Sequence, residues 1–298
     1  MEKEKILILL AGQSNMAGRG YAGSDDLIAV PRVEFLRPDL KWVPAVEPIT
    51  KDRSFVGTFN EDGSKIESED PFETVMPQSG QKICGVGLGR TFGRLLAETY
   101  PDREIGLIPA AVGGTSIAAW MPGGVDDWDP MGHPYDTAVL RAKEALKTGR
   151  IAAVLWHQGE TDAKRQTEHY AEKLRSVVLN FRKDLSLDDS VPFIAGEMAS
   201  FYPDKIAAHI DIVDHALQEL EKELPSFRVV KTKDLDHRGD HMHFDTPSLH
   251  ELGARYFAAY RRFESDLNAA SIKGIKAGCA SASNGSMDGS SPKIYRFQ

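Results

Sequence analysis

Five short apolar runs alternate with longer segments of helical periodicity, and this alternation constrains the fold more than any other feature of the chain. The apolar runs span residues 6–10, 105–111, 151–156, 191–196 and 227–231. Helical patterns follow at 87–100, 135–147, 163–183, 204–223 and 248–267. Short buried strands separated by helices are typical of a parallel sheet with crossover helices. The sequence therefore predicts a three-layer α/β/α domain around a central five-stranded parallel sheet.

Two stretches depart from this alternation. Residues 20–81 are rich in Pro, Asp, Glu, Gly and Ser and have no sustained period, so we expect a long irregular insertion with a functional or lid-like role. Residues 269–298 are rich in Gly, Ser, Ala and Lys, a composition that buries little apolar surface and predicts a flexible tail. Residues 1–268 are then expected to form one domain.

The charge and the hydropathy of the chain exclude several classes of partner. A formal net charge of −8 argues against nucleic acid, because phosphate binding needs a basic face. No stretch approaches the ~20 apolar residues of a membrane span. The N-terminus carries charges of both signs and resembles no signal peptide, so we expect a cytoplasmic protein. Cys84 and Cys279 form neither a disulfide framework nor a metal-ligand spacing.

Ser14 follows the first apolar run directly and is the strongest candidate for a nucleophile. Ligand and catalytic groups of α/β sheets gather at the carboxyl ends of the strands, where this serine is expected. A helix cap is the alternative role, because serine is a favoured cap residue. Near the other end of the chain, Asp240 precedes His243 by three residues. These three side chains suggest a serine hydrolase whose parts come from both ends of the sequence.

Acyl transfer assigns a role to each of these groups. A serine hydroxyl is a weak nucleophile until an imidazole takes its proton, and the imidazole needs a carboxylate that holds its tautomer. Ser14, His243 and Asp240 fill these roles. Glu160 is a rival for the acid, with support of its own loop as the other interpretation. His237, His241 and His250 compete with His243 for the base, and His243 is preferred because Asp240 precedes it by three residues.

The charge that develops on the carbonyl oxygen needs fixed hydrogen-bond donors. Gly113 and Gly114 have no side chains, so a backbone N–H there can approach a substrate closely. Gln158, a neutral amide, could add a donor without competing as a base. Beyond the glycines lie Trp120 and Trp128, which are candidates for a sugar-stacking platform. A loop pinned by its own aromatic residues is the alternative interpretation.

Residues 236–243 also contain the residue types of a metal site, although Arg238 within the segment disfavours a cation. This leaves a metal-dependent hydrolase as an alternative. A non-catalytic carbohydrate-binding module is a further one.

The chain resembles the SGNH hydrolase superfamily and, within it, the carbohydrate acetylesterases related to sialate O-acetylesterase and acetyl xylan esterase (carbohydrate esterase family six). The resemblance covers nearly all of residues 5–265 and rests on four blocks in order: Gly12-Gln13-Ser14-Asn15-Met16, Gly113-Gly114-Thr115-Ser116-Ile117, Trp156-His157-Gln158-Gly159-Glu160-Thr161-Asp162, and Asp240 three residues before His243. In the wider superfamily an aspartate precedes the serine and an asparagine replaces Gln158. Gln13 and Gln158 both match the acetylesterase branch. The esterase elbow Gly-x-Ser-x-Gly is absent, which argues against the ordinary α/β-hydrolase fold.

The resemblance implies a flavodoxin-like sheet, a Ser-His-Asp triad and no cofactor or metal. It also implies an oxyanion hole made by the N–H of Ser14, the N–H of Gly114 and the side chain of Gln158. Gln13, Asn15, Gly113 and Glu160 are then expected to support the site. The expected activity is removal of acetyl groups from acetylated sugars, of the xylan-derived or sialic acid type, through an acyl-serine intermediate. The sequence does not indicate which sugar carries the acetyl group, nor the oligomeric state.

Overall fold

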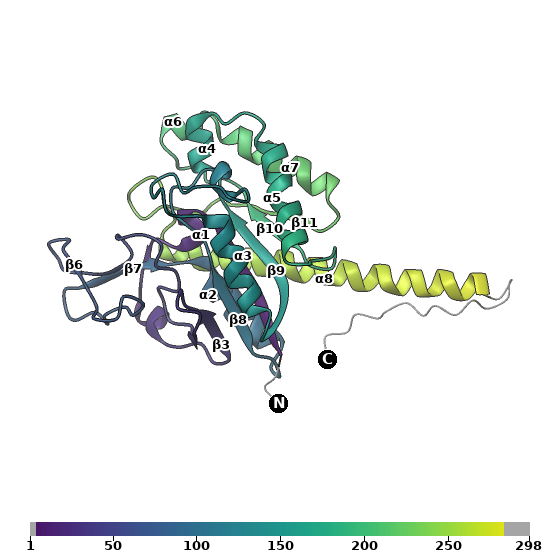
Figure 1. Ribbon diagram of the computed structural model, residues 1–298, viewed down its shortest axis with the longest axis horizontal. Helices are drawn as coiled ribbons and strands as arrows, with labels where there is room; N and C mark the ends of the chain where they lie inside the picture. The colour runs from purple at the N-terminus through teal and green to yellow at the C-terminus, as the bar shows by residue number, and fades with distance from the viewer. Residues whose placement is uncertain (1–3, 283–298) are drawn as a thin grey trace.

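A seven-stranded sheet runs through the centre of the protein (Figure 1). The structure is a computed structural model that describes residues 4–282, with side chains described to residue 270. The strands of the sheet are β1 (Lys5–Gly12), β3 (Val33–Leu36), β4 (Trp42–Pro44), β8 (Ile105–Pro109), β9 (Gly149–His157), β10 (Phe193–Gly196) and β11 (Phe227–Val230). Their order is β11-β10-β9-β1-β8-β3-β4, and every neighbouring pair is parallel except β3 and β4.

Helices cover both faces of this sheet (Figure 1). The longer helices are α2 (Leu88–Thr99), α3 (Pro134–Ala145), α5 (Tyr170–Asp184), α7 (Ile210–Glu223) and α8 (Thr246–Ala282). On one face α2 packs against α8, with the rings of Phe92 and Phe257 5.9 Å apart. On the other face α3 packs against α5, with the rings of Tyr135 and Phe181 4.9 Å apart, and α7 lies beside α5. The predicted three-layer α/β/α class is confirmed.

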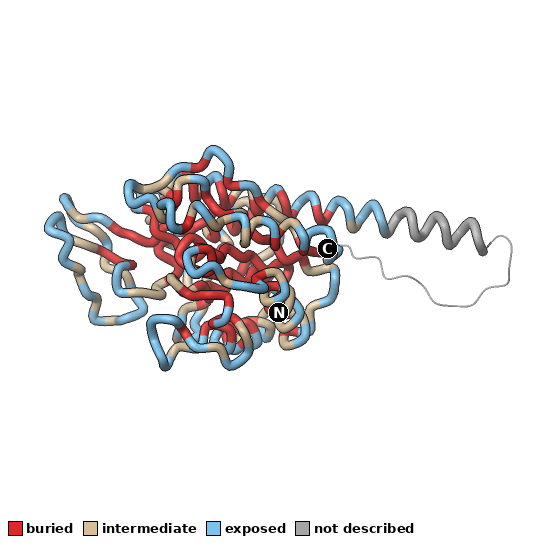
Figure 2. The backbone as a smooth tube through the Cα atoms, turned by 90° about the horizontal axis from the view of Figure 1, so that it is seen from above, coloured by how far each residue is buried: buried red, intermediate tan, exposed pale blue. Residues whose placement is uncertain are grey.

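Strand β1 lies in the middle of the sheet and of the core, where Figure 2 shows continuous burial. Its side chains from Ile6 to Leu10 are all at most 1% exposed. An unbroken apolar run is required because both faces of a parallel sheet are covered by helices. At the carboxyl end of β1, Gly12 pairs with His157 of β9. The ends of these two strands therefore lie side by side at the edge that carries the site.

The prediction of five strands was incomplete. All five predicted runs form strands, but β3 and β4 extend the sheet at the β8 side. Both strands come from the segment 20–81, which was expected to be irregular. Strand β3 has four residues and β4 has three, too few for an alternating pattern to stand out from the polar sequence around them.

The insertion also contributes three short strands to a second, four-stranded sheet in the order β2-β7-β5-β6. Its strands are antiparallel: β2 (Gly20–Tyr21), β5 (Gly57–Phe59), β6 (Lys65–Ile66) and β7 (Lys82–Val86). Figure 1 shows this small sheet beside the main one, on the side away from β11. The insertion is thus an ordered lobe, and its loops border the carboxyl edge of β1.

Two helix predictions and the prediction of a flexible tail need correction. The pattern at 163–183 forms two helices, α4 (Glu160–Arg165) and α5, because Gln166 and His169 adopt left-handed backbone conformations between them. The pattern at 204–223 is likewise divided into α6 (Asp204–Ala207) and α7. Helix α8 continues to Ala282, so residues 269–282 of the expected tail are helical. The rest of that tail, 283–298, lies outside the described residues.

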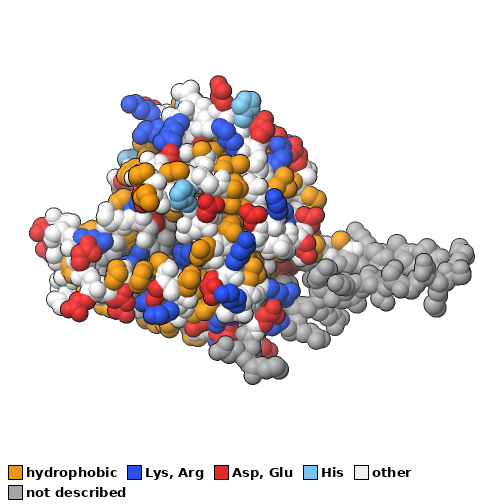
Figure 3. All heavy atoms as spheres, viewed as in Figure 1, with side chains coloured by type: hydrophobic (Ala, Val, Ile, Leu, Met, Phe, Trp, Pro, Cys, Tyr) orange, Lys and Arg blue, Asp and Glu red, His pale blue; other side chains and the backbone are white. Residues whose placement is uncertain are grey.

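No helix within residues 4–282 combines the length and the apolar character needed to cross a bilayer. Figure 3 shows acidic and basic side chains interspersed over the face seen in Figure 1. That face carries no continuous basic field of the kind that binds phosphate backbones.

Candidate active site

Ser14 begins the short helix α1 (Ser14–Ala17) directly beyond the central strand β1. The chain turns at Gly12, where φ is +130° and an added Cβ would lie 2.2 Å from the carbonyl oxygen of His157. Only glycine fits such a close approach. The turn places the Ser14 side chain, 7% exposed, at the carboxyl edge of the sheet. This is the edge at which α/β sheets hold their ligands.

Ser14, His243 and Asp240 form one continuous chain of hydrogen bonds. His243 Nε2 lies 3.1 Å from Ser14 Oγ, although 229 positions separate the two residues. On the other side of the ring, His243 Nδ1 lies 2.8 Å from Oδ2 of Asp240. With the proton on Nδ1 and donated to Asp240, Nε2 is free to accept the serine hydroxyl. The structure therefore brings the three predicted catalytic side chains together in the order that proton transfer requires.

The acid and the imidazole come from one tight turn between β11 and α8. Asp240 Oδ1 accepts the backbone N–H groups of Met242 at 2.9 Å and of His243 at 2.8 Å. An aspartate that bonds to the backbone two and three residues later fixes its own turn. Asp240 Oδ2 also accepts Nε of Arg238 at 2.7 Å. The three-residue spacing in the sequence thus corresponds to a locally fixed acid-base pair.

The pKa values of this pair favour the active protonation states. Burial alone would raise the pKa of Asp240, but hydrogen bonds from His243 and Arg238 hold that pKa well below its usual range. Burial lowers the pKa of His243 and outweighs the hydrogen bond that the ring donates to Asp240, which raises it. At neutral pH the carboxylate is therefore charged and the imidazole is neutral, as a general base requires.

Asn15, the residue after the serine, holds the backbone on both sides of His243. Its Nδ2 donates to the carbonyl oxygen of Met242 at 3.2 Å, and its Oδ1 accepts the N–H of Phe244 at 3.2 Å. Asn15 is almost completely buried. One side chain therefore ties the turn that carries the base to the helix that carries the nucleophile.

Glu160 supports this connection by holding the side chain of Asn15. Its Oε1 accepts Asn15 Nδ2 at 2.7 Å and the hydroxyl of Tyr202 at 2.9 Å. The carboxylate that contacts the imidazole is Asp240. Glu160 thus stands in the supporting position, and its contribution to activity stays a prediction.

Backbone N–H groups beside Ser14 are the available oxyanion donors. A Cβ atom at Gly113 would lie 3.5 Å from Cβ of Ser14, so the glycine pair borders the serine. The N–H of Gly113 already donates to Oδ2 of Asp52 at 2.6 Å. Within the described part of the chain, no hydrogen-bond acceptor is paired with the N–H of Ser14 or of Gly114. These two groups can receive a developing negative charge.

Gln158 is fully buried, and its amide is engaged inside the protein. Nε2 lies 2.5 Å from Oδ2 of Asp162, 3.1 Å from the carbonyl oxygen of Thr115 and 3.3 Å from Oε1 of Gln13. An amide nitrogen carries two hydrogens, so these acceptors already occupy it. The structure does not bring this amide to the hydroxyl of Ser14. Donation from Gln158 to a substrate stays a prediction.

Asp52 of the insertion takes part in a buried ion pair that the sequence did not reveal. Arg19 and Asp52 pair at 2.6 Å, with side chains 0% and 2% exposed. Asp52 holds the N–H of Gly113, while Arg53 donates to its carbonyl oxygen from Nε at 3.0 Å and Nη2 at 2.7 Å. Single charged residues in a segment without periodicity give no motif by which they could be predicted.

A third arginine, Arg238, links the acid turn to the small sheet. Its Nη1 donates to the carbonyl oxygen of Arg19 at 2.7 Å and to Sγ of Cys84 on β7 at 3.1 Å. Burial raises the pKa of the Cys84 thiol, so the thiol stays neutral at this contact. The position of Asp240 therefore depends on contacts with both lobes.

The expectation that Trp120 belongs to a sugar platform is wrong. Its side chain is fully buried, and its ring meets that of Trp156 edge-on at 5.2 Å. A side chain without an exposed face has no surface to offer a substrate, so Trp120 matches the alternative of a loop pinned by its aromatic residues.

Trp128 differs, because 68% of it is exposed. A Cβ atom at Gly114 would lie 2.8 Å from its Nε1, and the guanidinium of Arg53 lies 5.7 Å from the ring centroid. An exposed indole thus borders the glycine pair. Its contact with a substrate stays a prediction.

Residues 236–243 do not form the donor cluster that the alternative of a metal site requires. Nδ1 of His237 accepts the N–H groups of Gly239 at 3.0 Å and of His241 at 3.2 Å, while Asp240 is shared between His243 and an arginine. Among the described side chains, no group of three or more His, Cys, Asp or Glu residues is arranged to hold an ion. His237 is directed to the backbone of this turn, His243 to Ser14 and Asp240, and the Asp240 carboxylate to His243 and Arg238.

A central parallel sheet with a serine at the end of its middle strand, bonded to a histidine and an aspartate from the last loop, defines the class of SGNH-type esterases. The family model described as carbohydrate esterase, sialic acid-specific acetylesterase matches residues 4–262, and the chain belongs to this family. A probable carbohydrate esterase from Arabidopsis thaliana is 31% identical over 273 residues, which cover 85% of this chain and 89% of the plant protein.

Solved structures show the same architecture. The structure of the Arabidopsis thaliana protein superposes with a TM-score of 0.65 at 28% identity, covering 87% of this chain and 98% of that one. NanS gives a TM-score of 0.63 at 17% identity, with 89% and 99% of the two chains covered. XAC1771, a carbohydrate acetylesterase from Xanthomonas citri, gives 0.56 at 18% identity, covering 87% of this chain and 56% of that one. At their low identity the last two show the shared fold alone.

Proposed function

We propose that this protein is a carbohydrate O-acetylesterase that acts through an acyl-serine intermediate. The observation that carries the proposal is the hydrogen-bonded chain from Ser14 through His243 to Asp240, with contacts of 3.1 Å and 2.8 Å. Membership of an acetylesterase family supports acetyl transfer to water as the reaction.

In this mechanism the Ser14 oxygen attacks the acetyl carbonyl carbon while His243 Nε2 accepts the hydroxyl proton. Asp240 stabilises the imidazolium that forms. Collapse of the tetrahedral intermediate breaks the bond to the sugar oxygen, which takes the proton from His243. A water molecule then transfers its proton to the same histidine and attacks the acyl-serine, and acetate leaves with Ser14 restored.

The N–H groups of Ser14 and Gly114 stabilise the oxyanion in both steps. Removal of one oxyanion donor typically costs about 2.7–4 kcal/mol of barrier, so the two donors account for a large part of the rate. Ser14 lies at the start of α1, where backbone N–H groups have no partners within the helix. The nucleophile and one donor thus come from the same residue.

The acetylated sugars that we propose as substrates are of the xylan-derived or sialic acid type. Exposed Trp128 borders Gly114 and offers an aromatic face to a sugar ring. Acetate release from a panel of acetylated xylo-oligosaccharides and acetylated sialic acids distinguishes the two types. Acetate release from neither type would contradict this choice of substrates.

Hydrolysis of an aryl acetate tests the reaction itself. We expect Ser14→Ala and His243→Ala each to lose at least about 10³-fold in kcat, as for other triads. Excess chelator should leave the wild-type rate unchanged, because no step uses a metal. Substantial turnover in either variant, or tight glycan binding without acetate release by the wild type, would contradict the proposal.

A further inference from the structure

The Arg53 side chain contacts the carbonyl oxygen of Gly113, which belongs to the same peptide group as the N–H of Gly114. That N–H is the second proposed oxyanion donor. We infer that Arg53 is a positioning residue, which aims and strengthens the N–H of Gly114 for the transition state. The inference rests on the proposed acyl transfer at Ser14 and assigns a role to the insertion of residues 20–81.

Two consecutive residues of the insertion hold both polar groups of Gly113. Asp52 accepts its N–H at 2.6 Å, and Arg53 donates to its carbonyl oxygen from two nitrogens at 3.0 and 2.7 Å. Asp52 is itself fixed by two hydrogen bonds from buried Arg19, at 3.0 and 2.6 Å. Gly113 is therefore held from both sides by charged side chains more than fifty positions away in the sequence.

The planarity of the peptide bond transmits this contact to the next residue. In a trans peptide the C=O and the following N–H point in opposite directions. Because Arg53 holds the C=O of Gly113, the N–H of Gly114 must point away from Arg53. Gly114 adopts φ +78°, a conformation in which a peptide flip would otherwise be easy for glycine. Arg53 thus selects one of the orientations that this flexible pair could adopt.

The positive charge of Arg53 also makes the N–H of Gly114 a stronger hydrogen-bond donor. A guanidinium on the carbonyl oxygen polarises the peptide, and hydrogen bonds in a chain strengthen one another in a medium of low dielectric constant. The Arg53 side chain is 13% exposed, so solvent screens this effect only weakly. The N–H of Gly114 should then respond to an oxyanion more than to a neutral carbonyl, which lowers the barrier without tightening substrate binding.

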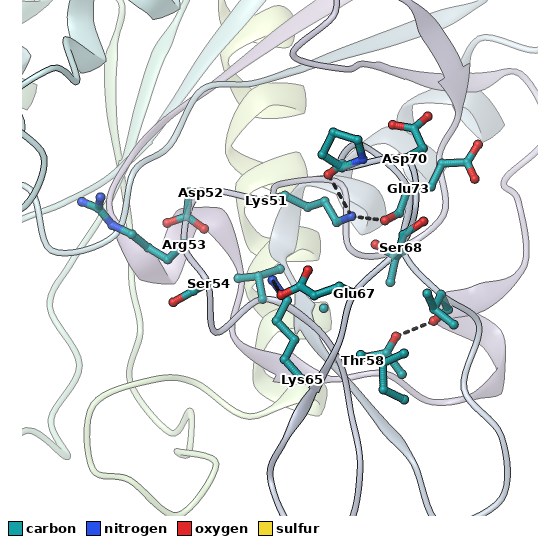
Figure 4. A pocket seen from close by; sticks show the side chains of 16 residues that line it. Lys51, Asp52, Arg53, Ser54, Thr58, Lys65, Glu67, Ser68, Asp70 and Glu73 are labelled. Atoms are coloured by element: carbon teal, nitrogen blue, oxygen red, sulfur yellow. Dashed lines mark hydrogen bonds and ion pairs between the residues drawn. The ribbon is translucent and has the colours of Figure 1, made fainter.

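Arg53 is held in place independently of any substrate. Its Nη2 donates to Oδ1 of Asp126 at 2.7 Å, and its guanidinium lies under the Trp128 ring. Arg53 is one of the residues that line a cavity of about 380 Å³ in the insertion, and Figure 4 shows its guanidinium pointing away from Lys51 and Glu67, which line the same cavity. Lys51 anchors the same segment by donating to the carbonyl oxygen of Pro71 at 3.4 Å. The Arg53 guanidinium is thus directed to the glycine pair.

The test compares Arg53→Met and Arg53→Lys with the wild type on an aryl acetate. We expect Arg53→Met to lower kcat by about 10- to 100-fold, less than complete loss of an oxyanion donor, with KM changed less than about twofold. Arg53→Lys keeps one charged donor and should recover part of kcat. Inhibition by an alkylboronic acid, whose serine adduct is tetrahedral and anionic, should weaken in parallel with kcat, whereas inhibition by acetate should not.

Arg37→Met is the matched control, because Arg37 also belongs to the insertion, pairs with Asp39 at 2.6 Å and lies 5.5 Å from an aromatic ring, that of Phe72. It should keep kcat within about twofold of the wild type. If Arg53→Met destabilises the fold, Arg53→Lys carries the test, because it keeps the charge beside Asp126.

Wild-type kcat in folded Arg53→Met and Arg53→Lys, or a raised KM at unchanged kcat, would overturn the inference while leaving the proposed function intact. A wild-type protein without esterase activity would instead overturn the proposed function, and this inference with it.

Discussion

Asn15 bonds to Phe244: its Oδ1 accepts that backbone N–H at 3.2 Å, so the neighbour of the nucleophile holds the neighbour of the base. The same side chain donates to the carbonyl oxygen of Met242. The 3.1 Å contact between Ser14 and His243 is therefore maintained by a buried amide and not by the two catalytic side chains alone. This arrangement makes a prediction about a residue that never touches the acetyl group.

Replacement of Asn15 by alanine should lower kcat on an aryl acetate by about tenfold or more, with a smaller change in KM, because a misplaced base acts mainly on the transition state. The groups left unpaired should also lower the free energy of unfolding by about 1–3 kcal/mol. Steady-state kinetics and urea unfolding measure the two effects.

Tyr202→Phe is the control for this variant. It removes a hydroxyl that bonds to Glu160 and Asn15 but leaves both contacts of Asn15 with the turn. Its kcat should fall less than that of Asn15→Ala. Equal losses in the two variants would show that the buried network matters and the contact with the turn does not.

Arg238→Met should move the acid limb of the kcat/KM profile to higher pH. In the wild type the limb should lie below pH 6.5, because burial lowers the pKa of His243, and the positive charge of Arg238 lowers it further. Without that charge the histidine protonates at a higher pH and loses its function as a base there. Arg255→Met removes an arginine of α8 that bonds to Glu251 and to the carbonyl oxygens of Lys231 and Lys233, and it should leave the limb in place. Equal limbs in the wild type and Arg238→Met would contradict the account.

Glu47 should make folding stability depend on pH. It is buried, its carboxylate accepts the N–H groups of Ile49 at 2.9 Å and of Gly87 at 3.2 Å, and burial raises its pKa to about 7. A raised carboxyl pKa favours the folded state at low pH, and that contribution is lost as the pH rises from about 4.5 to about 7. The loss is on the order of 3 kcal/mol at 1.36 kcal/mol per pKa unit.

Unfolding measured in urea from pH 4.5 to 8 for the wild type and Glu47→Gln isolates this contribution. The difference in unfolding free energy, wild type minus variant, should fall from pH 4.5 to about pH 7 and stay constant from there to pH 8. A difference that does not vary with pH would show that Glu47 ionises normally in the folded protein.

Two tryptophans of the same loop should respond in opposite ways to alanine. Trp128→Ala should raise KM for acetylated oligosaccharides by severalfold more than KM for an aryl acetate, because only the sugar reaches the exposed ring. Trp120→Ala should instead cost about 3–5 kcal/mol of stability, as a buried aromatic side chain does. Substrate selectivity unchanged in Trp128→Ala would remove this residue from the sugar site.

The sequence predicted those parts of the protein that depend on local patterns. Unbroken apolar runs identified five of the seven strands of the main sheet, and the three-residue spacing that the resemblance implies identified Asp240 and His243. Strands β3 and β4 were missed because strands of four and three residues are too short to show an alternating pattern. Helix 163–183 was predicted as continuous because left-handed residues such as Gln166 leave no compositional mark.

Contacts that depend on tertiary structure could not be read from the chain. Trp120 and Trp128 have the same residue type and similar neighbours, yet only one is buried. Asp52 and Arg53 reach Gly113 from a lobe of irregular sequence, across sixty positions for Arg53. The engagement of the Gln158 amide by internal acceptors likewise depends on packing among four separate segments. Side-chain partners at such distances are fixed by the fold as a whole.

The central claim is that Ser14 becomes acetylated during turnover. Rapid acid quenching of the protein with an aryl acetate, followed by peptide mass spectrometry, measures this directly. We expect one acetyl group on the peptide that contains Ser14, formed at the rate of the initial burst of phenol and absent in Ser14→Ala. Phenol released at the full rate without acetylation of Ser14, or with the acetyl group on another residue, would contradict the account.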